Sequence, residues 1–202
     1  HCNSHSSFKD KVSMSNLCQE ITLPTTPIQD IHDEQGEIAL CILSAVNVGG
    51  LNDLSELENI CDLSVRALEQ IIDYQDYPVK AAEVSTKKRR SLGIGYIGLA
   101  HYLAKNGVKY SDPKAWDLVD RLTEAFQYNL LRASCNIAME KGKCEGFERT
   151  KYAEGLLPID HYKKEIDEIV PHKQRMAWES LRKDIAKHGL RHSTLSAQMP
   201  SE

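Results

Sequence analysis

The sequence has no long hydrophobic run: no stretch approaches the roughly 18 consecutive apolar residues that indicate a membrane-spanning helix. It also has no signal peptide and no surplus of positive charge, because its 202 residues carry a formal net charge of −4. We therefore expect a cytoplasmic protein that binds neither a membrane nor DNA. The one basic run, residues 87–90, is too short to change this expectation and is typical of a solvated surface at the entrance to a strand.

Internal repeats and low-complexity tracts are absent as well, and 41% hydrophobic with 27% charged residues is an ordinary composition for a globular protein. A chain of this length forms one large domain or belongs to a larger one. It begins at His1 rather than at a methionine, and it ends on the turn-like sequence Pro200-Ser201-Glu202. We therefore expect a fragment or a processed product, truncated at both ends.

Six cysteines without a secretory context predict reduced thiols rather than a structural disulfide framework. Any disulfide should then be transient and part of a reaction. Near the start of the chain, His1, Cys2 and His5 could suggest zinc. Structural zinc sites, however, take two separated pairs of ligands, and no second pair with matching spacing follows. We therefore expect no metal site.

The apolar pattern predicts strands that alternate with amphipathic helices. The expected strands are residues 14–23, 38–46, 91–96 and 193–199, of which 38–46 is apolar enough to be buried on both faces. The expected helices are one from a cap at Asn52 or Asp53 to about Asp76, then residues 99–105, 113–141 and 178–188. Residues 143–171 should be rich in loops. Strands separated by helices indicate an α/β fold with parallel strand relationships.

Residues 93–98, Gly-Ile-Gly-Tyr-Ile-Gly, match the dinucleotide-binding fingerprint G-x-G-x-x-G. The surroundings argue against a nucleotide site, because residues 87–91 are basic and polar where a buried first strand should be apolar. The helix that follows is short, and the acidic candidates Asp112 and Asp117 lie at the start of another helix. We therefore interpret the glycines as residues that let a strand and a helix pack closely.

One short stretch, residues 15–20, carries more chemistry than any other. The strand period of two would place Asn16, Cys18 and Glu20 on one face, so that a carboxamide, a thiol and a carboxylate project together. Such a group combines a hydrogen-bonding amide, a sulfur nucleophile or radical site, and an acid or base. An edge strand with a solvated polar face and one buried thiol explains the same alternation.

These residues also carry a resemblance to a known family. The sequence resembles the catalytic large (alpha) subunit of class I ribonucleoside-diphosphate reductase along essentially its whole length. The segments that carry it are residues 1–6, 15–20, 36–41, 74–78, 90–95, 189–191 and 199–202. The resemblance implies part of a ten-stranded α/β barrel with a central finger loop and helices between the strands. Residues 1–202 would be one partial catalytic barrel domain, with 1–24 as the finger-loop region and 25–202 as strand and helix units.

The resemblance also implies roles for individual residues. Cys18 would become the thiyl radical that abstracts the ribose 3′ hydrogen, and Glu20 would accept the 3′-hydroxyl proton. Asn16 would hydrogen-bond the substrate, and Cys41 would be one of two redox-active cysteines that reduce the 2′ position and end as a disulfide. The expected substrate-binding residues are Asn16, Leu17, Cys18, Gln19, Glu20, Pro200, Ser201 and Glu202, of which the last three would begin the loop that holds the diphosphate.

The expected partners follow from the same resemblance. They are a ribonucleoside diphosphate substrate, a small radical-generating subunit that contains metal, and a reductant of the thioredoxin or glutaredoxin type. No cofactor should bind to this segment, and the ATP and dNTP effectors of this allosteric enzyme should bind parts of the subunit that the sequence does not include. The second reducing cysteine would lie upstream of His1, so we expect the chain alone to be inactive.

Two alternatives stay open at this point. The chain could be one piece of a split gene that works only after it binds complementary fragments of the same subunit. It could also belong to a glycyl-radical enzyme, since that class shares the barrel and the finger-loop cysteine. Cys41 and the ending Pro200-Ser201-Glu202 favour the reductase.

Overall fold

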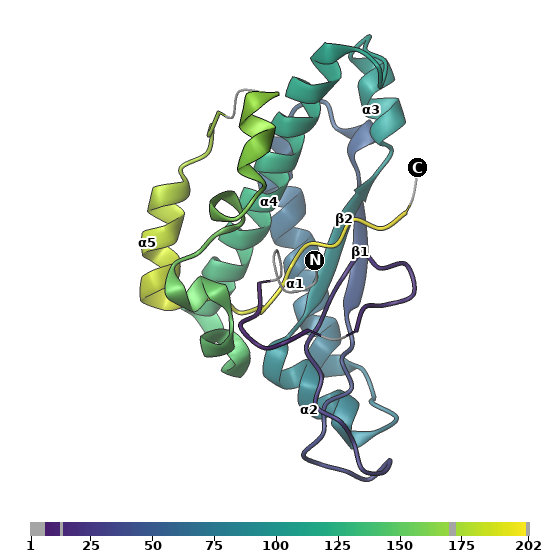
Figure 1. The fold of residues 1–202 in the computed structure, drawn as a ribbon, viewed down its shortest axis with the longest axis vertical. Helices are drawn as coiled ribbons and strands as arrows, with labels where there is room; N and C mark the ends of the chain where they lie inside the picture. The colour runs from purple at the N-terminus through teal and green to yellow at the C-terminus, as the bar shows by residue number, and fades with distance from the viewer. Residues whose placement is uncertain (1–6, 13, 170–172, 201–202) are drawn as a thin grey trace.

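The computed structural model describes residues 7–12, 14–169 and 173–200 (Figure 1). Within these ranges it contains two β-strands and five α-helices. The strands are β1 (Ile42–Asn47) and β2 (Leu92–Ile97). The helices are α1 (Glu56–Tyr74), α2 (Lys80–Arg89), α3 (Leu99–Lys105), α4 (Pro113–Lys141) and α5 (Trp178–His188). Short 3-10 helices cover Val48–Gly50, Glu145–Arg149, Lys151–Glu154, Pro158–Asp160 and Lys164–Glu168.

The two strands are parallel, with Ile42 opposite Leu92 and Asn47 opposite Ile97. Helices α1 and α2 make the connection from β1 to β2, which is the crossover that parallel strands require. The α/β class with parallel strands is therefore confirmed. No helix in the described part of the chain is both long enough and apolar enough to cross a membrane.

The predicted strand 193–199 runs beside β2 without forming a regular strand. Ile94 forms an isolated parallel bridge with Ser196, and the Ile94 amide donates to the Leu195 carbonyl over 2.8 Å. The Leu92 amide likewise donates to the Thr194 carbonyl over 3.1 Å. In Figure 1 this segment is the yellow trace that passes β2. β2 thus lies between β1 and the C-terminal segment.

The main core lies around α1, which packs against α4 and against both strands (Figure 1). The predicted apolar stripe of α1 is buried at Leu57, Cys61, Val65, Leu68 and Ile72. The stripe of α4 is confirmed at Leu122, Phe126, Leu130, Ala133 and Ile137. Trp116, which the stripe also included, is 50% exposed, because in the first turn of α4 the neighbouring Ala115 occupies the buried position.

Local capping explains where the helices begin. Asp112 accepts a hydrogen bond from the Lys114 amide over 3.0 Å and Pro113 occupies the first turn, so α4 starts as predicted. In α1, Asp53 accepts from the Ser55 amide over 2.8 Å and closes a turn of its own. The helix consequently begins at Glu56 rather than directly after Asp53. α3 and α5 have the predicted bounds.

Two predictions about the first half of the chain are wrong. Residues 38–46 were expected to form a strand buried on both faces, but β1 begins only at Ile42 and its exposure alternates along the strand. Leu43 is 52% exposed, because in the described structure β1 has β2 as its single strand neighbour. Residues 14–23 do not form a strand either, and their conformation is described with the site below.

The prediction of a solvated surface at the basic run 87–90 is wrong for its last two residues. Residues 87–89 end α2, a helix that the apolar pattern did not indicate because its buried face consists of small and polar residues. The last two, Arg89 and Arg90, are 6% and 4% exposed rather than solvated. Arg90 follows the helix with φ +47°, a left-handed conformation that is uncommon for a residue other than glycine.

The glycines of the fingerprint-like segment allow close packing, but not of a strand against a helix as predicted, because none of their nearest neighbours belongs to α3. A Cβ on Gly93 would lie 2.6 Å from Cys41 Sγ, and a Cβ on Gly95 would lie 2.5 Å from the Ala197 carbonyl oxygen. Glycine at these two positions therefore allows β2 to pack closely against Cys41 and against the C-terminal segment. Gly98 precedes α3 with φ +76°, which suits glycine.

Candidate active site

The stretch from Ser15 to Thr22 folds back on itself as a hairpin-like loop. The Gln19 amide donates to the Asn16 carbonyl over 3.1 Å, and Gln19 has φ +61°. The Asn16 side-chain Oδ1 accepts from the Ile21 amide over 3.2 Å, which ties the two arms together. Ser15 and Thr22 form an antiparallel bridge where the arms meet. Leu17 and Cys18 therefore occupy the tip of a tight turn.

This turn corrects the prediction that Asn16, Cys18 and Glu20 share one face of a strand. A chain that reverses at Gln19 does not alternate its side chains with a period of two. Cys18 is exposed at the tip, beside Leu17, which is 96% exposed. Glu20 instead lies on the returning arm and is partly buried.

Glu20 and Cys41 form the chemically distinctive pair of the region. Glu20 Oε2 is buried and has no hydrogen-bond partner among the described residues. Burial, together with the nearby charge of Glu20, raises the pKa of the Cys41 thiol to about 12. Cys41 is consequently a protonated thiol at neutral pH. An unpartnered buried carboxylate oxygen is energetically costly, and each such group in a native protein calls for an explanation.

A pocket of about 330 Å³ opens beside this pair. Asn16 and Cys41 both line it, and much of the remaining wall is apolar, including Ile21, Leu23 and Ala39. Cys18 and Glu20 are not among its lining residues. Asn16 and Cys41 therefore line the same pocket, whereas Cys18 stands apart at the tip of the loop.

A small hydrophobic cluster packs against the loop and includes residues from its returning arm. Its buried members are Phe8, Val12, Ile21, Leu23 and Ala197, with Ala39 and Cys41 packed against it. Ala197 belongs to the C-terminal segment, so the chain that leads to Pro200 passes close to Cys41. Pro200 itself is exposed, and the predicted substrate residues Ser201 and Glu202 lie outside the described residues.

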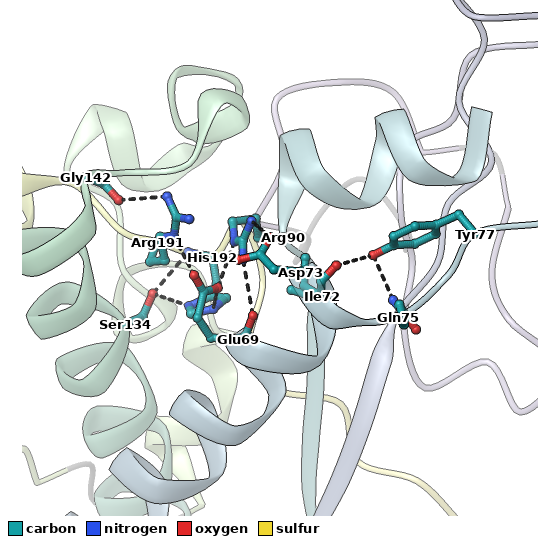
Figure 2. Close-up of polar contacts among 10 residues, drawn as sticks. All are labelled: Glu69, Ile72, Asp73, Gln75, Tyr77, Arg90, Ser134, Gly142, Arg191 and His192. Atoms are coloured by element: carbon teal, nitrogen blue, oxygen red, sulfur yellow. Dashed lines mark hydrogen bonds and ion pairs between the residues drawn. The ribbon is translucent and has the colours of Figure 1, made fainter. Parts of the chain in front are cut away.

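A buried polar cluster that the sequence analysis missed centres on Glu69 of α1 (Figure 2). Glu69 Oε2 accepts from Arg90 Nε over 2.7 Å and lies 3.0 Å from His192 Nε2, while Oε1 accepts from Arg191 Nε over 2.8 Å. Burial alone would raise the pKa of Glu69. The hydrogen bonds from His192, Arg90 and Arg191 outweigh that effect and lower the pKa to about 2.

His192 completes this cluster as a neutral ring. A carboxylate only accepts hydrogen bonds, so the partners assign the proton to Nε2, which faces Glu69. Nδ1 then accepts from the Ser134 hydroxyl of α4 over 2.9 Å, and Ser134 Oγ accepts from the His192 amide over 3.2 Å. Complete burial lowers the pKa of His192. A single histidine and scattered arginines give no periodic signal, which is why the sequence did not reveal the cluster.

No group of three or more histidine, cysteine, aspartate or glutamate residues in the described ranges is arranged to hold a metal ion. The histidines and cysteine weighed as zinc ligands, His1, Cys2 and His5, lie outside these ranges. The five described cysteines are Cys18, Cys41, Cys61, Cys135 and Cys144, and all are free thiols.

Fold and site together define a segment of an α/β domain that presents one thiol on a loop tip and holds a second beside a carboxylate. Over residues 1–202 the sequence matches the family described as "Ribonucleotide reductase, barrel domain". The chain therefore belongs to the ribonucleotide reductase barrel-domain family, as the resemblance of its motifs indicated.

Individual relatives agree with this assignment. The chain is 58% identical to the ribonucleoside-diphosphate reductase subunit alpha of Haemophilus influenzae and 57% identical to that of Buchnera aphidicola subsp. Baizongia pistaciae, each over 205 residues. It is 54% identical over 205 residues to ribonucleoside-diphosphate reductase 1 subunit alpha of Escherichia coli. Each alignment covers 100% of this chain and 27% of the relative. The chain is thus homologous to part of an oxidoreductase large subunit.

Proposed function

We propose that this chain supplies the radical-carrying part of a class I ribonucleoside-diphosphate reductase, which makes deoxyribonucleotides as DNA precursors. In this proposal it forms part of a ten-stranded barrel, and the loop that bears Cys18 is the central finger. One observation carries the proposal. An exposed thiol stands at the tip of a braced turn, while Glu20, whose buried Oε2 has no partner among the described residues, lies near enough to Cys41 to raise the pKa of that thiol.

The chemistry divides among these side chains. Cys18, as a thiyl radical, takes the hydrogen atom from C3′ of the ribose and becomes a thiol. Glu20 accepts the 3′-hydroxyl proton on its unpartnered Oε2, where a carboxylate within hydrogen-bond reach acts as general base. The C2′–O bond breaks and the 2′-hydroxyl leaves as water with a thiol proton. Glu20 finally returns its proton to the 3′ oxygen, and Cys18 returns a hydrogen atom to C3′ and regenerates its radical.

The reducing equivalents come from Cys41 and a second cysteine elsewhere in the subunit. Two thiols together supply two electrons and two protons, C2′ gains hydrogen in place of oxygen, and the two sulfurs end as a disulfide. The raised pKa of Cys41 suits this role, because a thiol rather than a thiolate can donate the proton that the leaving hydroxyl needs. Asn16 uses its Oδ1 to brace the loop, so its hydrogen bond to the substrate would come from the Nδ2 amide group.

The same proposal includes the expected partners. A ribonucleoside diphosphate is the substrate, a small metal-containing subunit generates the radical, and a thioredoxin or glutaredoxin type reductant reopens the disulfide. The segment that ends at residues 200–202 would hold the diphosphate. ATP and dNTP effectors would act on regions of the subunit outside this segment.

The test uses a complete alpha subunit that carries this segment, assayed with its small subunit and reductant. Cys18→Ser should abolish both deoxynucleotide formation and loss of the C3′ hydrogen. Cys41→Ser should abolish product formation while radical chemistry on the substrate still begins. Cys135→Ala, which changes a buried thiol of α4, should retain turnover. Turnover by Cys18→Ser would contradict the assignment.

A second candidate function is assembly, in which the chain acts only after binding complementary fragments. The observation that favours it is the half-exposed Leu43 on β1, a strand that β2 pairs on one side alone within the described structure. We expect the isolated chain to make no deoxynucleotide and to recover activity when mixed with the remainder of the subunit. Elution of the two parts as separate species, without recovered activity, would exclude this function.

A further inference from the structure

We propose that Arg89 and Arg90 are positioning residues that fix two segments relative to each other, the loop-bearing segment 11–36 and the C-terminal segment 193–199. The two arginines are adjacent in sequence but bind different partners. Arg89 ends α2, and the left-handed backbone of Arg90 reverses the chain before β2. The assignment of these segments to catalysis rests on the proposed function, whereas the contacts themselves do not.

Arg89 joins the two ends of the loop-bearing segment. Its Nη2 donates to Glu37 over 2.8 Å, and its Nη1 donates to Asp10 over 3.3 Å. Its guanidinium also lies over the Phe8 ring, 5.8 Å from the centroid. Asp10 precedes residues 11–36 and Glu37 follows them, so one guanidinium closes the segment at its base. Closing a long loop in this way removes much of its conformational freedom.

Arg90 performs the corresponding task for the C-terminal segment, through Glu69 (Figure 2). Arg90 binds Glu69 over 2.7 Å, and the same carboxylate accepts from Arg191 and His192, the residues that lead into segment 193–199. Arg90 also makes two hydrogen bonds to Asp73, over 3.0 and 2.8 Å. Asp73 does not touch the C-terminal segment in any of these contacts.

The backbone between the two arginines and β2 holds the C-terminal segment as well. The Ser193 amide donates to the Arg89 carbonyl over 3.0 Å. The hydroxyls of Ser91 and Ser193 lie 3.3 Å apart, and both side chains are buried. A displacement at residues 89–91 is therefore passed to segment 193–199 by main-chain and side-chain bonds alike.

The burial of these ion pairs fits a positioning role in addition to any effect on stability. Glu37 is 4% exposed and Glu69 1% exposed. Buried charges lose hydration, and apolar replacements of similar volume are often as stable or more so, so a buried ion pair is weak evidence for stability. Its directional bonds instead select one geometry. Here that geometry relates the loop with Cys18 to the segment that ends at Pro200.

The experiment compares Glu69→Gln with Asp73→Asn in a complete alpha subunit with its small subunit. Both changes remove a carboxylate that binds Arg90, but only Glu69 contacts Arg191 and His192. We expect Glu69→Gln to raise KM for the nucleoside diphosphate about tenfold while kcat changes less than about twofold. Asp73→Asn should leave both parameters close to those of the parent. Equal effects of the two changes on KM would overturn the proposal.

A change at the base of the loop-bearing segment should affect kcat more than KM, the opposite of the pattern expected for Glu69→Gln. Glu37→Gln should lower kcat about tenfold with a smaller change in KM, because the loop carries the reacting groups. Glu83→Gln, which changes a partly exposed carboxylate of α2 that pairs with Lys80 and Lys87, should alter neither parameter. A shift of KM and kcat in the same proportion for Glu37→Gln and Glu69→Gln would indicate general loss of structure and would contradict the proposal.

Amide hydrogen exchange separates this proposal from the proposed function. Glu69→Gln should speed exchange of the amides of residues 193–199 while exchange in residues 14–23 changes little, and Glu37→Gln should do the reverse. Unchanged exchange in both segments would overturn the proposal even if the enzyme is a reductase. If Glu69→Gln does not fold, Arg191→Lys tests the same contact, with a smaller change in the same direction expected.

Discussion

Two glutamates, one in the helical region and one in the loop region, have opposite surroundings. Glu69 in α1 receives hydrogen bonds from Arg90, Arg191 and His192, which use both of its carboxylate oxygens. Glu20 in the loop has a buried oxygen with no hydrogen-bond partner among the described residues. Both positions are costly for a carboxylate, but only the first is compensated by partners in the part of the chain that the structure describes.

The two glutamates therefore suit different roles, Glu69 a structural one and Glu20 a chemical one. A buried carboxylate whose two oxygens both accept hydrogen bonds from the protein, as in Glu69, holds neighbouring elements in place and is shielded from a substrate. A carboxylate with a spare oxygen beside a protonated thiol keeps the capacity to bind one, at a cost in stability. In the proposed reductase the substrate hydroxyl would supply the missing partner of Glu20. The helical region should therefore govern stability and the loop region activity.

The largest expected effect on stability tests this division directly. Leu130→Ala in α4 removes a fully buried side chain and should lower the free energy of unfolding by about 2–5 kcal/mol. Leu17→Ala at the loop tip, where the side chain is 96% exposed, should change it by less than about 0.5 kcal/mol. Urea unfolding of the chain, followed by circular dichroism, measures both. Similar losses for the two variants would contradict the division.

A smaller effect is expected where the two regions meet. Gly93→Ala would place a Cβ 2.6 Å from both Cys41 Sγ and Leu43 Cδ2, so these side chains must move. Such overpacking costs about 1–3 kcal/mol, and displacement of Cys41 should also reduce deoxynucleotide formation in the complete subunit. Gly50→Ala is the matched control, because a Cβ there meets no atom within 4 Å. Equal activity of the two variants would show that Cys41 does not need its present position.

Acid should weaken the helical region through its buried cluster. The pKa of His192 is lowered from its ordinary value of 6.5, so the unfolded chain binds its proton more readily and stability falls as pH drops below about 6.5. The pKa of Glu69 is lowered from 4.5 to about 2, so its contribution is lost as pH falls from about 4.5 toward 2. Each group contributes at most about 1.4 kcal/mol per pH unit.

Urea midpoints at pH 7.5, 5.5 and 3.5 measure this dependence. In His192→Gln the decline between pH 7.5 and 5.5 should become shallower, while the decline below pH 4.5 remains. A parent chain whose midpoint is constant from pH 7.5 to 5.5 would show that the buried ring does not govern stability in that range.

Local signals predicted much of the helical region from the sequence. Asp112 followed by Pro113 specifies a helix start through its own side chain and ring, and Gly189 specifies a helix end, so α4 and α5 were predicted correctly. Helix α2 was missed because Ala81, Ala82 and their polar neighbours form its buried face, without an apolar stripe. Ion pairs between residues far apart in the sequence, rather than local secondary-structure propensity, decide which charged residues are buried.

The sequence supplied candidate residues for the site but not their geometry. Asn16 and Cys41 line one pocket and Glu20 lies near Cys41, although a strand with a two-residue period is not the reason. The turn at Gln19 separates Cys18 from these residues. Gln19 has a left-handed backbone conformation, and because such turns usually contain glycine, the sequence did not predict this one. Their catalytic roles stay predictions until the cysteine variants are assayed.

The smallest predicted effect compares two similar hydrogen bonds, one from each region. Asp112 accepts from the Lys114 amide over 3.0 Å at the start of α4, and Asn16 accepts from the Ile21 amide over 3.2 Å inside the loop. Asp112→Ala and Asn16→Ala each remove one side-chain acceptor, so each should lower the free energy of unfolding by about 1 kcal/mol. Stability alone would therefore not distinguish them.

Activity should distinguish them sharply. Asp112 caps a helix outside the candidate site, so Asp112→Ala should leave turnover in the complete subunit unchanged. Asn16→Ala should lower kcat/KM by at least about tenfold, because it loosens the turn that presents Cys18 and removes the amide proposed to bind the substrate. Asn16→Asp, which keeps an acceptor for the Ile21 amide but lacks the Nδ2 donor, separates these two causes. If it restores stability but not activity, the amide donor is what the reaction needs.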